Sequence, residues 1–393
     1  MRTDTNSRAF LILLVMLSML GPLTLNILVP SLPGMVDSLK APKESVQLTL
    51  SLYLLGMAVG QLMLGPLADR FGRRPVLLVA LVLYILSSLA AYLAPNVEML
   101  IVARILQSFG ATAGITLGRT MIRDLYSRDS AASMIAYVTM AMVIAPMVSP
   151  VLGATIDDLF GWRAILLFCS VLGFMSFVIA APILPETRPE SLVAATAGDV
   201  ARRSMELLGD RRFMGFWGAG AFCSGMFFAF LGTAPYLMIE VLGRPKTEYG
   251  LWFMTLSLGY MAGNFVSGRF APSLGGERLI FWGNMVGLVG ALLILAGAIT
   301  GWLHPLALFI PAMVASFGNG LVLPSSIAAG VGINPLAAGA GSGLLGFGQM
   351  GLGAVASYLG GKLVTGTAMP LAIIMTVCAV LALASGWLSR RED

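Results

Sequence analysis

Long, unbroken runs of apolar residues follow one another along this chain of 393 residues. Each run approaches the roughly 20 residues that an α-helix needs to cross the hydrocarbon core of a bilayer. Charged residues make up only 11% of the chain, against roughly 25% in an average soluble protein. So few charges cannot cover a soluble globule, and so many apolar residues exclude a disordered chain. We therefore expect a protein that folds in lipid.

The length of the runs decides between the two structures that can span a membrane. Barrel strands would be short and alternating, whereas these runs are long and continuous. The first run, Phe10 to Val29, is too long for a signal-peptide core, and we expect it to be retained as a helix. The sequence predicts an all-α membrane protein with twelve transmembrane helices. We place them near residues 9–30, 44–67, 76–94, 97–121, 130–155, 163–184, 212–240, 247–270, 277–299, 303–328, 335–361 and 367–388.

A polar stretch, residues 185–211, separates two sets of six apolar runs. We interpret it as a cytoplasmic linker between an N-terminal bundle, residues 1–184, and a C-terminal bundle, residues 212–393. Part of it, residues 191–208, is expected to lie on the membrane as an amphipathic helix. Most of the 24 lysines and arginines fall on the linker's side of the spans. The positive-inside rule then places both chain ends in the cytoplasm.

The two halves resemble each other weakly. Three glycines of the first half recur in the second at one constant spacing: Gly60 and Gly263, Gly65 and Gly268, Gly72 and Gly275. The triplet Ser-Phe-Gly at 108–110 also recurs at 316–318. Two related bundles packed face to face suggest a central cavity whose halves rock for alternating access.

The residues that carry most enzyme and metal chemistry are scarce. Cys169, Cys223 and Cys378 all fall inside apolar runs, which argues against disulfides and a metal site. The sole histidine, His304, is expected at an interfacial turn. We therefore predict no enzyme activity and no cofactor. The net charge of +5 is spread between the runs, so we expect no nucleic-acid partner. The expected partners are a small-molecule substrate and membrane lipid, and we expect a monomer.

A loop between the second and third runs, residues 65–75, crowds glycines and charges into a tight connection. Gly65 would permit close helix contact. Asp69 is placed to accept from a helix N-terminus. The loop's arginines can pair with acids or anionic headgroups. A plain positive-inside anchor would explain the arginines but not the aspartate and the spaced glycines, so we interpret the loop as a gate.

Arg104 lies within the fourth run, where a charge is costly. Arg104, Gln107 and Ser108 share one face at helical spacing and form a polar stripe that we expect to face the cavity. The alternative is snorkelling, because Arg104 is only about 9 Å of helical rise from Glu98 at the outer surface.

The fifth run contains two prolines, Pro146 and Pro150, within one span. Each proline removes a backbone donor, which predicts a kinked helix.

These three features resemble the Major Facilitator Superfamily. The loop resembles its signature G-x-x-x-D-R-x-G-R-R, the fourth run resembles its R-x-x-Q-x-x-G motif, and the fifth run is similar to the antiporter motif of its drug exporters. The resemblance implies that the loop latches the two bundles on the cytoplasmic side and that Arg104 is linked to proton coupling. The second-half copy of the loop has Pro272 in place of the aspartate, so we expect an asymmetric latch.

Three further stretches, residues 26–33, 119–126 and 343–350, look like the Bcr/CflA group of drug:proton antiporters. This resemblance implies a secondary active transporter of the bacterial inner membrane that exports small organic compounds, with protons as the coupling ion. The gating residues that it implies are Gly65, Asp69, Arg70, Gly72, Arg73, Arg74, Arg119, Asp124, Pro146 and Pro150.

Asn26 departs from that group, which usually has an aspartate at this position. An asparagine does not titrate, and no acid of this chain falls near the middle of a span. Either coupling uses an acid nearer a surface, Glu98 or Asp37 beside Arg104, or the carrier is not driven by protons. With Arg104 as the only deep charge, we expect anionic or neutral ligands rather than lipophilic cations.

Candidate substrate contacts are the polar and aromatic residues of the central spans, any of which could equally face lipid or core. They are Asn26, Tyr53, Gln107, Tyr137, Phe227, Tyr236, Asn319 and Gln349. Multidrug efflux and the export of one dedicated metabolite or metallophore remain alternatives. A channel is disfavoured because it would need a continuous polar pore lining.

Overall fold

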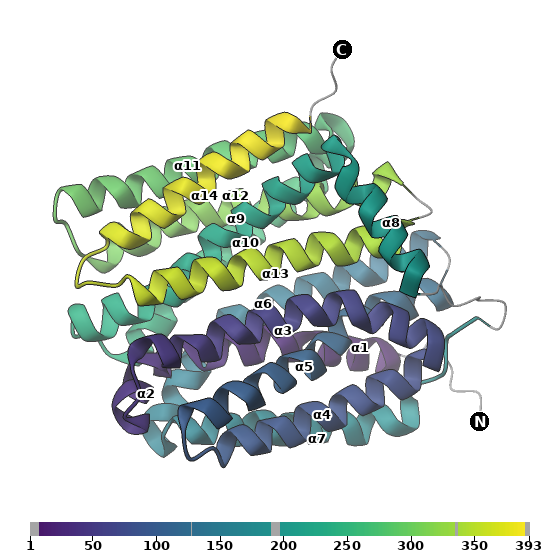
Figure 1. The fold of residues 1–393 in the computed structure, drawn as a ribbon, viewed down its shortest axis with the longest axis horizontal. Helices are drawn as coiled ribbons and strands as arrows, with labels where there is room; N and C mark the ends of the chain where they lie inside the picture. Colours follow the sequence, from purple (N-terminus) through teal and green to yellow (C-terminus); the bar gives the residue numbers. More distant parts are fainter. Residues whose placement is uncertain (1–7, 127, 190–196, 335–336, 390–393) are drawn as a thin grey trace.

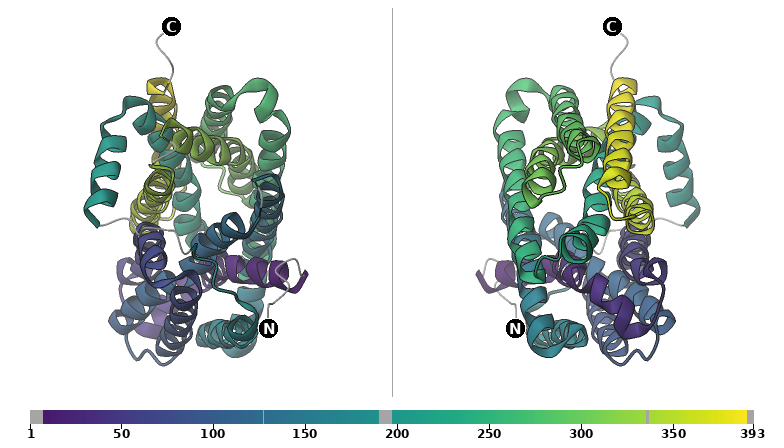
Figure 2. Two further views of the ribbon diagram at one scale, coloured as in Figure 1. Left: turned by 90° about the vertical axis from the view of Figure 1, so that its right-hand side faces the viewer. Right: turned by 90° about the vertical axis from the view of Figure 1, so that its left-hand side faces the viewer.

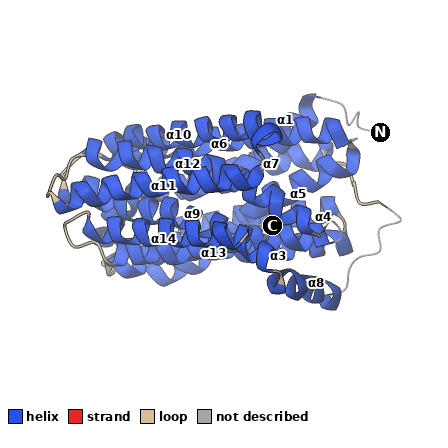
Figure 3. Cartoon of the chain, turned by 90° about the horizontal axis from the view of Figure 1, so that it is seen from above, coloured by secondary structure: helices blue, strands red, loops and turns tan. Residues whose placement is uncertain are grey.

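A computed structural model describes residues 8–126, 128–189, 197–334 and 337–389. Within these ranges the chain is helical and contains no strand (Figure 3). The long helices are α1 (Arg8–Ile27), α3 (Lys43–Phe71), α4 (Arg73–Tyr92), α5 (Val97–Leu125), α6 (Arg128–Phe160), α7 (Trp162–Ile183), α9 (Arg211–Tyr236), α10 (Lys246–Leu274), α11 (Gly276–Ile299), α12 (Pro305–Ile333), α13 (Ala338–Lys362) and α14 (Met369–Leu388). The short elements are η1 (Val29–Ser31), α2 (Leu32–Leu39), α8 (Ala197–Gly209) and the π-helical η2 (Leu237–Val241).

The long helices correspond one to one with the predicted spans. Ten of the helical segments in the described part are long and apolar enough to cross a membrane. The two long helices outside this set are α10 and α13. Both pack along the opposite half of the molecule, α10 on α6 and α13 on α3. A helix that faces a protein surface rather than lipid need not be apolar throughout, which explains the lower hydropathy of these two.

The helices form two bundles of six, coloured purple to teal and teal to yellow (Figures 1 and 2). In the first bundle α5 packs on α3 and α4, and in the second α12 packs on α10 and α11. Gly110 and Gly318, which the sequence repeat pairs, make equivalent contacts. A Cβ at Gly110 would collide with the α4 backbone, and one at Gly318 with the α11 backbone. The repeat therefore marks the same close helix crossing in each half.

The two ends of the bundles carry different elements. Helix α8 lies at one end, where α1 begins and α14 ends, and α2 lies at the other (Figure 1). We call these the α8 end and the α2 end. Leu207 anchors α8 against Phe213 and Leu344, while Met205 is 71% exposed. The amphipathic helix expected at 191–208 is present as α8, although residues 190–196 lie outside the described part.

Candidate functional site

Arg104 is buried inside the first bundle. Its side chain is 1% exposed and its guanidinium lies 4.1 Å from the centre of the Tyr53 ring. One guanidinium nitrogen donates to Gln107 Oε1 at 2.6 Å. Nε donates to the backbone carbonyl of Thr49 at 3.5 Å, and both terminal nitrogens lie 3.4 Å from the backbone carbonyl of Thr24. These contacts exclude the snorkelling alternative, and they bring three predicted site residues together.

The Arg104 cluster continues through neutral side chains. Gln107 Nε2 donates to Ser88 Oγ at 2.7 Å, and Thr24 and Tyr84 share a 2.6 Å hydrogen bond between their hydroxyls. Ser108, predicted to share the stripe, instead donates to a carbonyl of its own helix. It packs against Gly56 of α3 rather than joining the cluster. The polar stripe thus points into the first bundle, beside a pocket that is lined entirely by this bundle and is too small to hold a water molecule.

The two acids that were expected beside Arg104 lie away from it. Glu98 and Asp37 are both exposed near the α2 end. Within the described chain, the groups that act electrostatically on Arg104 are Tyr53, Tyr84 and Cys169, and they include no carboxylate. Asn26 is 2% exposed and donates to the carbonyl of Pro22 at 2.8 Å, while its Oδ1 has no partner. The first-helix position is therefore buried, but it holds no titratable group.

At the α2 end two ion pairs join the bundles. Lys43 Nζ lies 2.6 Å from Glu240 Oε2, and Lys246 Nζ lies 2.7 Å from Asp157 Oδ2. Lys43 and Lys246 begin α3 and α10 and stand at the same spacing as the repeated glycines. Each lysine reaches an acid of the opposite half. We call this pair of contacts the α2-end latch.

Two further contacts reinforce this latch. Gln47, one turn along α3 from Lys43, donates to the Ser357 carbonyl of α13 at 2.9 Å. Tyr236 is fully buried with its ring 4.5 Å below the Lys43 ammonium. Tyr236 was predicted as a substrate contact, but the structure places it in the latch. Because Gln47 is fully buried, this part of the seam is shielded from water.

The two prolines of α6 lie where that helix meets the second bundle. Helix α6 runs without a break through Pro146 and Pro150. A Cβ at Gly250 of α10 would lie 2.8–3.0 Å from the Pro150–Val151 backbone. The Pro150 turn is thus a close contact between the bundles, as its predicted gating role requires. Ser149, beside it, is 1% exposed and its hydroxyl has no partner.

At the α8 end the signature loop forms an ion cluster within the first bundle. The Arg73 side chain is 5% exposed and pairs with both Asp69 and Asp124, the latter at 3.2 Å. Asp69 was predicted to accept from a helix N-terminus, and this prediction is wrong. Asp69 lies in the last turn of α3, and its carboxylate pairs with the Arg73 guanidinium. The N-terminus of α4 is held by Glu186, which accepts from the backbone N–H groups of Arg73 at 2.9 Å and Arg74 at 3.2 Å.

Glu186 joins the linker to this loop. It also accepts from the backbone N–H groups of Thr187 and Arg188. Burial raises the pKa of the Glu186 carboxyl, but the four backbone donors outweigh burial and leave the pKa below its usual range. Gly72 has φ of +98°, and a Cβ there would lie 2.5 Å from Glu186 Oε2. Only glycine suits both the backbone and the carboxylate at this turn.

The remaining residues of the loop are more open. Arg70 is exposed beside the Phe71 ring, and Arg74 is exposed and donates to the Ala181 carbonyl at 2.9 Å. Gly65 was predicted to permit close helix contact, but nothing lies within 4 Å of a Cβ built on it. The same is true of Gly268. One turn away α3 still meets the opposite bundle, because a Cβ at Gly346 of α13 would collide with Gln61 Oε1.

Arg119 is a further cation on α5, and its side chain is partly buried. It lies in the last two turns of α5, and its Nε is buried without a hydrogen-bond partner.

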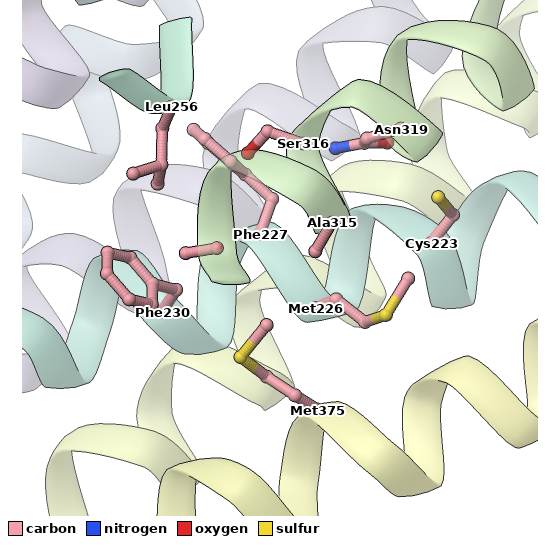
Figure 4. Close-up of a pocket in the computed structure, with 10 residues that line it drawn as sticks. Cys223, Met226, Phe227, Phe230, Leu256, Ala315, Ser316, Asn319 and Met375 are labelled. Carbon is pink, nitrogen blue, oxygen red and sulfur yellow. The ribbon is translucent and has the colours of Figure 1, made fainter. Parts of the chain in front are cut away.

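A small cavity of about 10 Å³ lies inside the second bundle (Figure 4). Phe227 and Asn319, both predicted substrate contacts, line it, together with Cys223, Met226 and Phe230. Its wall is mostly apolar, with Ser316 and Asn319 supplying polar groups (Figure 4). In this conformation it has room for little more than a water molecule.

Two predicted substrate residues lie elsewhere. Gln349 of α13 is 6% exposed, and its Nε2 has no partner. The side chain of Tyr137 lies outside the described residues.

Sequence reasoning missed Glu186 and the latch lysines, Lys43 and Lys246. The shared spacing of those lysines with the repeated glycines was a signal that could have found them, whereas nothing local marks Glu186.

In the described part of the chain, twelve long helices form two bundles joined through α3–α13 and α6–α10, an arrangement that fits a membrane transporter. The sequence matches the family described as the Major Facilitator Superfamily over residues 14–357, and the chain belongs to this family. The expected fold is thereby confirmed, and so is the expectation of a transporter rather than an enzyme.

Three relatives show how far the similarity extends. A Bacillus subtilis protein described as an uncharacterized MFS-type transporter, YdgK, is 33% identical, covering 96% of this chain and 94% of that protein. The Haemophilus influenzae bicyclomycin resistance protein homolog is 28% identical, covering 97% and 96%. Multidrug resistance protein D of Escherichia coli is 29% identical, covering 94% and 93%.

Solved structures share the fold at lower identity. A D-xylose–proton symporter matches with a TM-score of 0.75 at 15% identity, covering 96% of this chain and 97% of that chain. The xylose transporter XylE from E. coli, in a partially occluded inward open conformation, matches with a TM-score of 0.74 at 13% identity, covering 96% of each chain.

Proposed function

We propose that this chain is a secondary active transporter that exports small organic compounds by alternating access. The observation that carries the proposal is the position of the bonds between the bundles. Within the described chain, the hydrogen bonds and ion pairs from one bundle to the other all lie toward the α2 end. The loop of residues 65–75 at the α8 end is bonded within the first bundle and to the linker. Toward that end α3 meets α13 through the packing of Gln61 and Leu62, with no hydrogen bond or ion pair across the bundles in the described chain. The bundles are therefore bonded together at one end and held by packing alone at the other, as a rocking pair of bundles requires.

The α8 end is the cytoplasmic end in this proposal. Most basic residues of the chain gather there, as expected from the positive-inside rule. The proposed units are residues 1–184 and 212–393, with 185–211 as the cytoplasmic linker, in the inner membrane of a bacterium and as a monomer. The conformation is then inward-facing, with the α2-end latch closed toward the outside.

Multidrug export is favoured over a dedicated exporter by the similarity to the bicyclomycin and multidrug resistance proteins. The test is expression of the chain in a drug-sensitive bacterium that lacks its main efflux pumps. Resistance to several chemically unrelated compounds, lost in the double variant Lys43→Gln and Lys246→Gln, supports multidrug efflux. Loss of one secreted compound on gene deletion, without any resistance, identifies a dedicated exporter instead.

Proton antiport needs a carboxylate that lies outside the middle of the spans. Within the described chain, the buried charged side chains are those of Arg73 and Arg104. No aspartate or glutamate there is buried to the same extent. The candidate proton carriers are therefore acids near one end of the spans, and we propose Glu98 and Asp37. In proteoliposomes, an imposed pH gradient should drive uptake of a labelled substrate, and Glu98→Gln or Asp37→Asn should reduce it. An uptake rate that is the same with and without the pH gradient contradicts proton coupling. It does not affect the assignment of this chain as a transporter.

A further inference from the structure

Tyr236 carries a hydroxyl group without a partner inside the α2-end latch. Its side chain is fully buried, and the hydroxyl forms no hydrogen bond within the described chain. The residue lies on α9 of the second bundle, and its ring is 4.5 Å from the Lys43 ammonium of the first bundle. The Tyr236 side chain is therefore part of the seam where the two bundles meet at the α2 end.

Gln47, one turn along α3 from Lys43, is also only partly satisfied. Its Nε2 donates to the Ser357 carbonyl and hydroxyl of the second bundle, at 2.9 and 3.0 Å. Its Oε1 is buried and has no partner among the described residues. A Cβ at Gly361 would lie 2.5 Å from this oxygen, and one at Gly232 would lie 2.7 Å from Nε2. The amide is thus enclosed by α9 and α13, with its carbonyl against a glycine rather than a hydrogen-bond donor.

These two unpaired groups act against the bonds that close the α2 end. A buried polar group without a hydrogen bond destabilises the state that buries it, because it has given up its bonds to water without replacing them. When the bundles part at this end, Lys43 and Gln47 move away from α9, and water reaches the unpaired groups. The closed seam is therefore weakened by residues that line it, while the ion pairs of Lys43 and Lys246 strengthen it.

Alternation between two conformations requires such a balance. The two conformations must be close in free energy, since a state that lies far above the other is hardly populated. Two ion pairs and the buried Gln47 bonds all favour closure of the same end. The unpaired hydroxyl and carbonyl offset part of that preference without removing any bond between the bundles.

We propose that the Tyr236 hydroxyl and the Gln47 carbonyl keep the α2 end ready to open, because they make its closed seam less stable than its bonds alone would make it. The inference rests on the proposed export function, since it treats opening of the α2 end as the step that releases the exported compound. It gives Tyr236 a role in the balance between conformations, where the sequence predicted a substrate contact.

Tyr236→Phe tests the proposal, because it removes the hydroxyl oxygen and keeps the ring beside Lys43. Spin labels are attached at Pro95→Cys and Thr365→Cys, exposed loop positions at the α2 end of the first and second halves, and the three native cysteines are buried. The full-length protein in nanodiscs then gives the ratio of closed to open distances. Removal of a buried unpaired group should raise this ratio about fivefold or more. The same change added to Lys43→Gln, which favours the open state, should move the ratio back toward closed.

Tyr249→Phe is the matched control. Tyr249 is also fully buried with an unpaired hydroxyl in the described chain, but its ring packs on Phe253 and Phe309 inside the second bundle. This variant should leave the ratio of closed to open distances unchanged. An unchanged or lower ratio in Tyr236→Phe, or an equal rise in Tyr249→Phe, would overturn the proposal.

The same labels separate this proposal from the export function. Two interconverting distances in a protein that transports none of the compounds tested remove the export function and leave the role of Tyr236. Transport in proteoliposomes, together with a ratio that is indifferent to Tyr236→Phe, removes that role and leaves the exporter. A single distance in both the wild type and Lys43→Gln contradicts alternating access and this proposal together.

Discussion

Lys246 and Asp157 tie the start of α10 to the end of α6, with 2.7 Å between Nζ and Oδ2. The Asp157 side chain is only 7% exposed, so this bond is shielded from solvent. Lys43 makes a second bond of this kind, from the first bundle to Glu240 of η2. The two lysines stand at repeated positions, while their acids come from the ends of different helices, and together the contacts join the bundles at the α2 end.

Breaking this bond should favour opening of the α2 end. A cross-bundle ion pair of this kind contributes up to about 1 kcal/mol, so Lys246→Gln should raise the open population roughly fivefold. Spin labels placed on the two bundles at this end would report the change in distance distribution. Arg244→Gln is the control, since Arg244 pairs with Glu248 of its own half. An equal shift in both variants would show that local charge, and not the bond, controls opening.

Replacing Arg104 by lysine should destabilise the first bundle. Lysine keeps the charge, but its single ammonium cannot both bond Gln107 and the two carbonyls and stack on Tyr53. We expect a loss of roughly 2 kcal/mol in the free energy of unfolding, measured by thermal unfolding of the purified protein. Arg163→Lys is the control, because Arg163 stacks on Trp162 and bonds a carbonyl in a less buried setting. Equal effects of the two changes would argue against a special Arg104 cluster.

Gly72→Ala should disrupt the turn between α3 and α4. The new Cβ would meet the Glu186 carboxylate as well as an unfavourable positive φ. Gly275→Ala is a matched control at the repeated position, with φ of +81° and nothing within 4 Å of the added carbon. Gly72→Ala should therefore cost roughly 1 kcal/mol more than Gly275→Ala in thermal unfolding. If the two variants unfold alike, backbone strain alone accounts for the glycine.

The contribution of Glu186 should depend on pH. Its pKa is lower in the folded protein, so the ionised carboxylate stabilises the fold above the pKa of the unfolded chain, about 4.3. This stabilisation is lost as the pH falls through the lowered folded value. Glu186→Gln should reduce the unfolding temperature at neutral pH, and the difference from the wild type should shrink in acid below pH ~4. A difference that persists unchanged in acid would mean that the ionised carboxylate is not responsible.

Several site residues could be identified from local sequence, and others could not. Arg104 and Gln107 stand at helical spacing in an apolar run, so their pairing follows from the periodicity of one helix. The partners Thr24 and Ser88 come from other helices, and ordinary hydroxyl residues give no local signal. Asp69 was given the wrong partner, because the carboxylate that holds the α4 N-terminus arrives from the linker. Gly65 lacks its predicted contact, although Gln61, one turn earlier on the same helix, packs against Gly346 of the opposite bundle.

The sequence alone determined the spans, their number and their division into two related halves, since the length and apolarity of a run are set by the thickness of the bilayer. The tertiary structure alone decided which charges find partners. Among the described residues Arg73 meets two acids and Arg119 meets none, although both stand near the ends of apolar runs. Partnership depends on which helices pack side by side, and that arrangement is fixed by contacts between residues far apart in the chain.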